Sequence, residues 1–208
     1  MRAFSLLLLA AGFAAAQPFS AGIKGGVPLT DFLNTAENGH VFYSTVPNRY
    51  IIGAMAELRL PFGLGVEFDA LYRHLNYAAS GGLTGVTPIT TSTTTANAWE
   101  FPLVAKYRFH APLVRPYIEG GIAWDTLQGV KQSILSGTSL GSTSSPADLN
   151  KTTTTGFVLG AGVDIHALVI HIAPEIRYTR WGAQHFLDPN GLLSSNQNQA
   201  EFLVGITF

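Results

Sequence analysis

Eight segments of the chain alternate apolar and polar residues with a period of two, the pattern of half-buried β-strands. Each segment is close to the 9–11 residues that a tilted strand needs to cross a bilayer. The segments cover residues 19–28, 49–60, 64–76, 97–109, 114–127, 155–165, 168–180 and 199–208. Because no helical period competes with them, the sequence predicts an all-β fold, an eight-stranded antiparallel up-and-down barrel.

The connections between these segments also alternate, between short and long. Residues 61–63, 110–113 and 166–167 form tight turns, and the long links are 29–48, 77–96, 128–154 and 181–198. With the N-terminus on the periplasmic side, every short turn faces the periplasm and every long loop faces outward, as in outer-membrane barrels. We expect the long links to be mobile. Their Ser/Thr-rich stretches, at 90–95, 133–145 and after Lys151, bury little apolar area.

The N-terminus has the pattern of a secretory signal peptide. Arg2 precedes an apolar run from Phe4 to Ala10, and Ala14–Ala16 supply an A-x-A cleavage site. We therefore divide the chain into a signal peptide at 1–16 and a barrel domain at 17–208. Two counts exclude other classes of protein. A net charge of -1 leaves no basic footprint for nucleic acid, and the absence of cysteine excludes disulfides, thiolate metal ligands and a thiol nucleophile.

One face of each segment carries charges, and the direction of that face decides between two kinds of barrel. A soluble lipocalin-like barrel places its apolar face inward, whereas a transmembrane barrel places that face toward lipid. The chain has only 12% charged residues, 47% hydrophobic residues and a mean hydropathy of +0.23. An exported chain of this composition must either bury much apolar surface or expose it to lipid. An Arg or Lys facing mid-bilayer lipid costs about 2–4 kcal/mol, so a membrane location requires the charges to lie inside.

Three features favour an interior for the charges. First, the polar face has small residues that suit a narrow lumen: Gly53, Gly121, Ala123, Gly160, Gly162 and Gly205. Second, aromatic residues of the apolar face lie near strand ends, as in two membrane girdles: Trp99, Trp124, Tyr178, Tyr107 and Phe109. Third, cations can neutralise carboxylates across the lumen. The cations are Lys24, Arg59, Arg73, Lys106, Arg108 and Arg177, and the carboxylates are Glu57, Glu67, Asp69, Glu100, Glu119, Asp125, Asp164, Glu175 and Glu201.

Two motifs resemble small bacterial outer-membrane β-barrel proteins of the OmpA-like and OmpX-like families. The first is Glu100-Phe101-Pro102-Leu103 leading into Lys106-Tyr107-Arg108-Phe109, a turn, then Arg115-Pro116-Tyr117 and Gly120-Gly121. The second is the last strand, which ends on the aromatic Phe208 like the sorting signal of such barrels. The resemblance implies an eight-stranded transmembrane barrel in the outer membrane of a Gram-negative-type bacterium. It also implies lipid and the barrel-assembly machinery as partners, and it says little about activity.

The sequence offers no catalytic, cofactor-binding or metal-binding residues that we would predict to act. His110 and His166 fall in turns, and His40 and His185 fall in loops. His74 lies on the apolar face, and His171 points inward on the same face as Glu175, about 13 Å away along the strand. Neither H-x-H nor H-E-x-x-H occurs, so no metal site is predicted. Glu67 and Asp69 are expected to pair with Arg59 or Arg73 rather than to act as acid and base.

The function that follows is a monomeric, non-catalytic barrel with a structural or surface-interaction role, presenting its long loops outside the cell. A narrow conduit for small or apolar solutes, similar to OmpW-like barrels, is the alternative. A lipid-modifying barrel enzyme is less favoured, because the strands contain no His-x-Ser pair. No cofactor and no nucleic-acid partner are expected.

The signal peptide gives the first prediction. Protein purified from membranes should begin at Gln17, because signal peptidase cuts after an A-x-A site, which Ala14 and Ala16 supply here. N-terminal sequencing is the measurement. Recovery of Met1 at the N-terminus would contradict the assignment.

Overall fold

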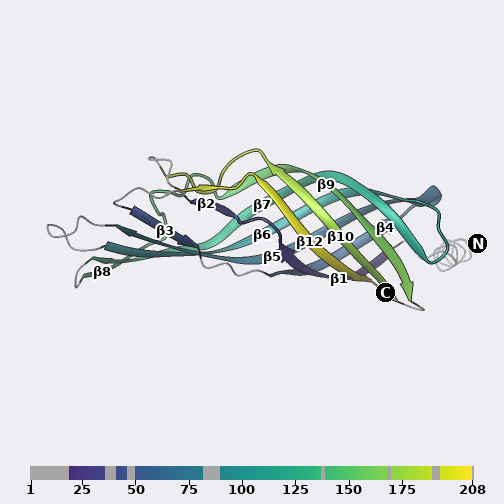
Figure 1. The fold of residues 1–208 in the computed structure, drawn as a ribbon, viewed down its shortest axis with the longest axis horizontal. Helices are drawn as coiled ribbons and strands as arrows, with labels where there is room; N and C mark the ends of the chain where they lie inside the picture. The colour runs from purple at the N-terminus through teal and green to yellow at the C-terminus, as the bar shows by residue number, and fades with distance from the viewer. Residues whose placement is uncertain are drawn as a thin grey trace, which may run out of the picture.

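A closed antiparallel barrel of eight long strands forms the body of the molecule (Figure 1). The computed structural model describes residues 19–35, 41–45, 50–81, 90–136, 139–167, 170–188 and 193–207, so the predicted signal peptide and Phe208 lie outside it. The strands are β1 (Phe19–Pro28), β4 (Ile51–Arg59), β5 (Leu64–Gly81), β6 (Thr90–Arg108), β7 (Val114–Ser136), β9 (Thr153–Ala167), β10 (Ile170–Trp181) and β12 (Asn198–Thr207). Each pairs with its neighbour in chain order, and β1 closes the ring on β12, with Lys24 opposite Gly205. Closure pairs the backbone groups of every barrel strand, as a bilayer requires.

The eight predicted strands correspond to these eight, but four are longer than predicted: β9 gains two residues at each end, and the other three extend much further at one end. β5 continues to Gly81, β6 begins at Thr90 and β7 continues to Ser136. The Ser/Thr-rich stretches expected as mobile loops are therefore largely strand, and that expectation was wrong. Their backbone groups pair in register, Thr91 with Ser80 and Thr93 with Ser133, and the β-branched threonine suits a strand.

These extensions form a sheet that projects beyond the barrel. β3 (Val41–Thr45) adds to β5 on one side, and β8 (Ser139–Thr143) adds to β7 on the other. We call the resulting five-stranded region the protruding sheet: β3, the outer part of β5, the outer part of β6, the outer part of β7, and β8. It occupies the end of the molecule opposite the barrel's C-terminus (Figure 1). A register shift between Thr95 and Asn97 marks where β6 passes from the barrel into this sheet.

The two ends of the barrel differ as the connection lengths predict. At one end, which we call the turn end, β4 and β5 are joined by the 3-10 turn η1 (Pro61–Gly63). Phe62 and Gly63 there have positive φ values of 64° and 80°, a conformation that glycine adopts freely. At the other end, the loop end, β2 (Leu33–Thr35) and β11 (Leu193–Ser195) pair as a small second sheet.

An apolar plug fills the loop end of the barrel. Inward-facing residues of β5, β6 and β7 pack with β2, β11 and the segment before β11 that carries Phe186. The plug consists of Leu33, Tyr77, Ala96, Ala98, Leu127, Val130, Phe186 and Leu193. Tyr77 also donates its hydroxyl hydrogen to Asp148, which ties the third long connection to the plug. Part of the loop segments is thus folded across the barrel mouth.

The outer wall of the barrel is apolar and the inner wall is charged, which confirms the predicted orientation of the faces. Ile23 on β1, Phe157 on β9 and Ile176 on β10 expose 59%, 73% and 58% of their surfaces, whereas Lys24 and Arg177 expose 1% and 0%. Side chains of a strand alternate between faces, so every strand contributes to both surfaces. The predicted aromatic residues also lie outside, with Trp99 against Tyr72 and Tyr107 against Phe109 at ring distances of 5.2 and 5.1 Å.

In the described part of the chain no helix has the length and apolar character to cross a bilayer.

Labelling of single cysteines can test which end of the barrel faces the cell exterior. The chain has no native cysteine, and Leu140 in β8 and Phe62 in η1 are each 83% exposed, at opposite ends. We expect Leu140→Cys to react with a membrane-impermeant maleimide on intact cells. Phe62→Cys should react only after the outer membrane is permeabilised, and the reverse pattern would invert the orientation.

Candidate functional site: the ion-pair network of the lumen

All eight barrel strands send charged side chains into the lumen. The six cations and nine carboxylates predicted for the polar face all point inward, and they form three groups along the barrel. We call these groups the central cluster, the turn-end cluster and the loop-end cluster. Apart from Arg59, whose side chain is 27% exposed, these side chains are buried. A barrel of eight strands has an interior just wide enough for side chains to fill it, which brings these charges into contact.

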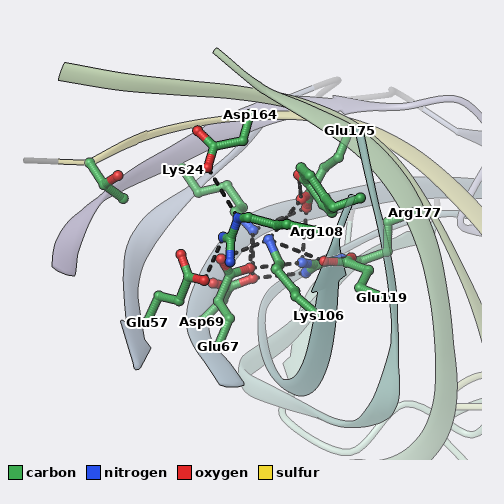
Figure 2. A network of polar contacts seen from close by, with 12 residues as sticks. Lys24, Glu57, Glu67, Asp69, Lys106, Arg108, Glu119, Asp164, Glu175 and Arg177 are labelled. Carbon is green, nitrogen blue, oxygen red and sulfur yellow. Dashed lines mark hydrogen bonds and ion pairs between the residues drawn. The ribbon is translucent and has the colours of Figure 1, made fainter. Parts of the chain in front are cut away.

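The central cluster places three cations among four carboxylates, and Figure 2 shows them converging from opposite walls. Lys24 Nζ lies 2.6 Å from Glu67, 3.0 Å from Asp69 and 3.0 Å from Glu175. Lys106 Nζ lies 2.8 Å from Glu67, 3.2 Å from Glu119 and 3.3 Å from Glu175. Each of these carboxylates contacts at least two cations.

Arg177 contacts all four carboxylates of the central cluster. Its Nε lies 2.9 Å from Glu119, and its terminal nitrogens lie 2.9 Å from Asp69, 2.9 Å from Glu175 and 3.4 Å from Glu67. A planar guanidinium presents five donors in a fixed fork, so one side chain can satisfy several acceptors. Arg177 therefore joins β10 to β5 and β7 across the lumen.

Tyr117 and three glycines complete the packing around the central cluster. The Tyr117 hydroxyl donates to Glu175 at 2.6 Å, and Lys106 Nζ lies 4.5 Å from the Tyr117 ring centroid. Gly160 faces Glu119 and Gly162 faces the Tyr117 ring, both too closely for a Cβ atom, and Gly205 lies against Met55 and Lys24. The predicted role of small inward residues is confirmed for Gly160 and Gly162, which leave room for the large side chains opposite.

The turn-end cluster contains Arg59 and Arg108 with Glu57 and Asp164. Arg108 binds Glu57 through Nη2 and Asp164 Oδ2 through Nε, the latter at 3.1 Å. Arg59 Nε lies 3.5 Å from Glu57, and its Nη2 lies 3.5 Å from Thr207 Oγ1. Figure 2 shows Arg108 between Glu57 and Asp164. This cluster links β4 and β6 to β9.

The loop-end cluster has one guanidinium for three carboxylates. Arg73 lies 3.2 Å from Asp125, 3.2 Å from Glu201 and 3.8 Å from Glu100. Phe32 covers its guanidinium at 4.9 Å, which places the apolar plug directly above this cluster. His185 lies in a loop, as predicted, but it is buried, with its Nε2 3.2 Å from Asp125.

The predicted partners of Glu67 and Asp69 were wrong. Among the described residues, Lys24 and Arg177 form ion pairs with both carboxylates, and Lys106 also pairs with Glu67. Arg59 and Arg73 pair with other carboxylates. Strand tilt explains the error, since tilting shifts the inward residues of neighbouring strands to different heights. A single sequence contains no direct record of that shift.

The histidines fall into different environments from one another. His74 lies at the outer wall with its Nδ1 2.9 Å from Asn97 Oδ1, as its apolar face predicted, and His110 is exposed at the turn end. His171 points inward as predicted, but its partner is Asp164 at 3.2 Å rather than any residue of its own strand. His166, expected in a turn, belongs to β9 and packs edge-on against His171 with ring centroids 3.9 Å apart. His40 lies outside the described residues.

A closed eight-stranded barrel with an apolar wall and a charged interior defines a bacterial outer-membrane β-barrel protein. The family model described as "Outer membrane protein beta-barrel domain" matches residues 3–208, and the chain belongs to this family. The outer membrane is accordingly its location, as predicted.

Solved structures with the same architecture include the outer membrane protein OprG from Pseudomonas aeruginosa. OprG is 12% identical, with a TM-score of 0.52, over 91% of this chain and 92% of that chain. Neisserial surface protein A (NspA) is 14% identical, with a TM-score of 0.45, over 91% and 96%. The N-terminal barrel domain of P. aeruginosa OprF is 13% identical, with a TM-score of 0.42, over 92% and 98%. At such identities the likeness to OprG concerns the fold alone. A comparison with curated proteins finds no match.

Removal of Arg177 should strongly destabilise the barrel. Arg177→Ala leaves four buried carboxylates without their shared guanidinium, and breaking a buried ion pair costs about 3–5 kcal/mol. Lys131→Ala, an exposed position on the outer part of β7, is the control and should change the free energy of unfolding by less than about 0.5 kcal/mol. Reversible urea unfolding in lipid vesicles compares the two. Equal small losses would mean that the lumen charges are solvated.

Proposed function

We propose that this protein is a monomeric, non-catalytic outer-membrane anchor that presents the protruding sheet as an interaction surface outside the cell. The observation that carries the proposal is the continuation of β5, β6 and β7 beyond the barrel, flanked by β3 and β8. Hydrogen-bonded strands hold this surface in a defined shape, which flexible loops do not.

The edge of the protruding sheet supports recognition of an extended peptide segment. Within the described residues β8 pairs with β7 only, so one of its edges carries backbone groups that no strand satisfies. Such edges add a strand from a partner, with side-chain pockets or apolar contacts providing specificity. Leu135 and Leu140 sit opposite each other in the β7–β8 ladder and are 44% and 83% exposed, an apolar pair in a Ser/Thr-rich surface.

The filled lumen argues against the alternative of a narrow conduit. Along the barrel axis, a solute meets first the apolar plug and then the three clusters of paired charges. Opening a path requires the separation of buried ion pairs, which is energetically costly. Planar-bilayer recordings of the purified protein are therefore expected to give no conductance steps above the lipid baseline. Regular steps would favour the conduit.

Cell attachment tests the role of the protruding sheet. Cells expressing the protein should adhere to protein-coated surfaces, and the double change Leu140→Asp with Ser142→Pro should abolish the gain, because it removes the apolar contact and a backbone donor. Phe62→Asp is the matched control, equally exposed but at the turn end. Both variants must reach the outer membrane in heat-modifiable form. Unchanged attachment by the double variant would rule the proposal out.

A further inference from the structure

We infer that the turn end of the lumen contains a binding site for a divalent transition-metal ion, formed by Asp164, His166 and His171. One ligand atom of each residue lies within 4.8 Å of the others. All three belong to the strands β9 and β10, and Asp164 is also a member of the turn-end cluster. The site is separate from the protruding sheet and does not depend on its proposed role.

The β9–β10 ladder places the three side chains together. Asp164 and His166 are two residues apart on β9, so both point to the inner face of the barrel. His171 on β10 is the direct cross-strand partner of His166. The signal in the sequence is therefore D-x-H followed by a histidine across a tight turn. Like H-x-H, the D-x-H pattern places two ligand side chains on the same face of a strand. A search for H-x-H and H-E-x-x-H alone misses it.

The ring nitrogens of the two histidines are oriented for a shared ligand. The imidazole rings lie with centroids 3.9 Å apart at an interplanar angle of 66°, and His171 Nδ1 lies 3.2 Å from Asp164 Oδ1. His166 Nδ1 is buried and has no hydrogen-bond partner among the described residues. A buried nitrogen without a partner is unfavourable, and a metal ion would satisfy it.

The surroundings of Asp164 resemble the outer shell of a metal site. Arg108 Nε donates to Asp164 Oδ2 at 3.1 Å and leaves Oδ1 directed toward His171. Groups that hydrogen-bond a ligating carboxylate fix its orientation and strengthen metal binding. Arg108 itself is held by Glu57, so the orientation of Asp164 is coupled to β4 as well as to β6.

The positive charge of Arg59 lies beside the site and disfavours a metal ion there, but the Arg59 side chain can move away. Its Nη1 lies 3.4 Å from His171 Nε2, where a guanidinium can only donate, so in this arrangement Nε2 accepts and Nδ1 carries the proton toward Asp164. Metal binding through Nδ1 moves the ring proton to Nε2 and displaces Arg59. The Arg59 side chain is 27% exposed at the mouth of the barrel, so it can turn toward water.

The donor set selects the class of metal. Two imidazoles and one carboxylate suit Zn²⁺, Co²⁺, Ni²⁺ or Cu²⁺, whereas Ca²⁺ and Mg²⁺ require mostly oxygen ligands. Three protein ligands leave a fourth tetrahedral position for water.

The carboxylates of Glu67, Glu119 and Glu175 are also close enough together to hold a cation, but Lys106 Nζ already lies within 3.3 Å of each.

Metal titration of the refolded, full-length mature barrel in detergent, without a histidine tag and after treatment with EDTA, tests the site. We expect one Zn²⁺ per barrel by calorimetry, visible absorption bands of tetrahedral Co²⁺, and a higher urea midpoint with Zn²⁺ present. His166→Gln should lower the Zn²⁺ affinity about tenfold or more, with little change in metal-free stability because His166 Nδ1 has no partner to lose. A purely structural role for His166 would not separate these two readouts.

Two further variants sharpen the test. Arg59→Gln should raise the Zn²⁺ affinity, because it removes the competing charge beside His171. His74→Gln, a half-buried histidine at the outer wall of the opposite end, should leave the affinity unchanged. The inference is overturned if wild-type protein takes up no Zn²⁺ with defined stoichiometry. It is equally overturned if His166→Gln binds Zn²⁺ as tightly as wild type, or if His74→Gln loses binding to the same extent.

Discussion

The pairing of buried charges in the lumen is the interaction on which the rest of this structure depends. A charge moved from water into a closed barrel loses its hydration, and only close, hydrogen-bonded partners offset that cost. In the central cluster every cation contacts at least three carboxylates, drawn from strands on different sides of the barrel. The network therefore acts as a set of cross-links between walls, and it is satisfied only when the ring of strands is closed in the correct register.

The same requirement explains where the small residues lie. A lumen filled by arginine, lysine, glutamate and tyrosine has no space for a further layer of large side chains, so glycine faces the largest of them. Gly160 opposite Glu119 and Gly162 opposite Tyr117 are examples. Apolar bulk is transferred to the outer wall, where lipid accommodates it. The partition of residue types between the two faces thus follows from filling a narrow charged interior.

The loop end has a different physical basis. Above Arg73 the lumen changes from charges to the apolar plug, and the strands β5, β6 and β7 continue outward as a sheet. One set of strands therefore does two things: its inner part closes the barrel and its outer part forms the protruding sheet. The register shift after Thr95 separates the two parts, because an irregularity in pairing lets a strand change direction and twist.

The number of strands, the alternation of short and long connections, and the inward direction of the charges could all be predicted from the sequence. These features are encoded locally, in a period of two along each strand and in the high cost of placing Arg or Lys against lipid.

Which charges meet depends on the tertiary structure. Lys24 and Glu67 are 43 residues apart and become partners only through the closure and tilt of the barrel. Residues 90–95 have polar side chains that predict a loop. They are strand because the neighbouring β5 and β7 supply their ladder partners. Likewise, Asp164, His166 and His171 become a cluster only when β9 and β10 pair, since the distance between side chains on two strands is fixed by register, which no local pattern in a single sequence specifies.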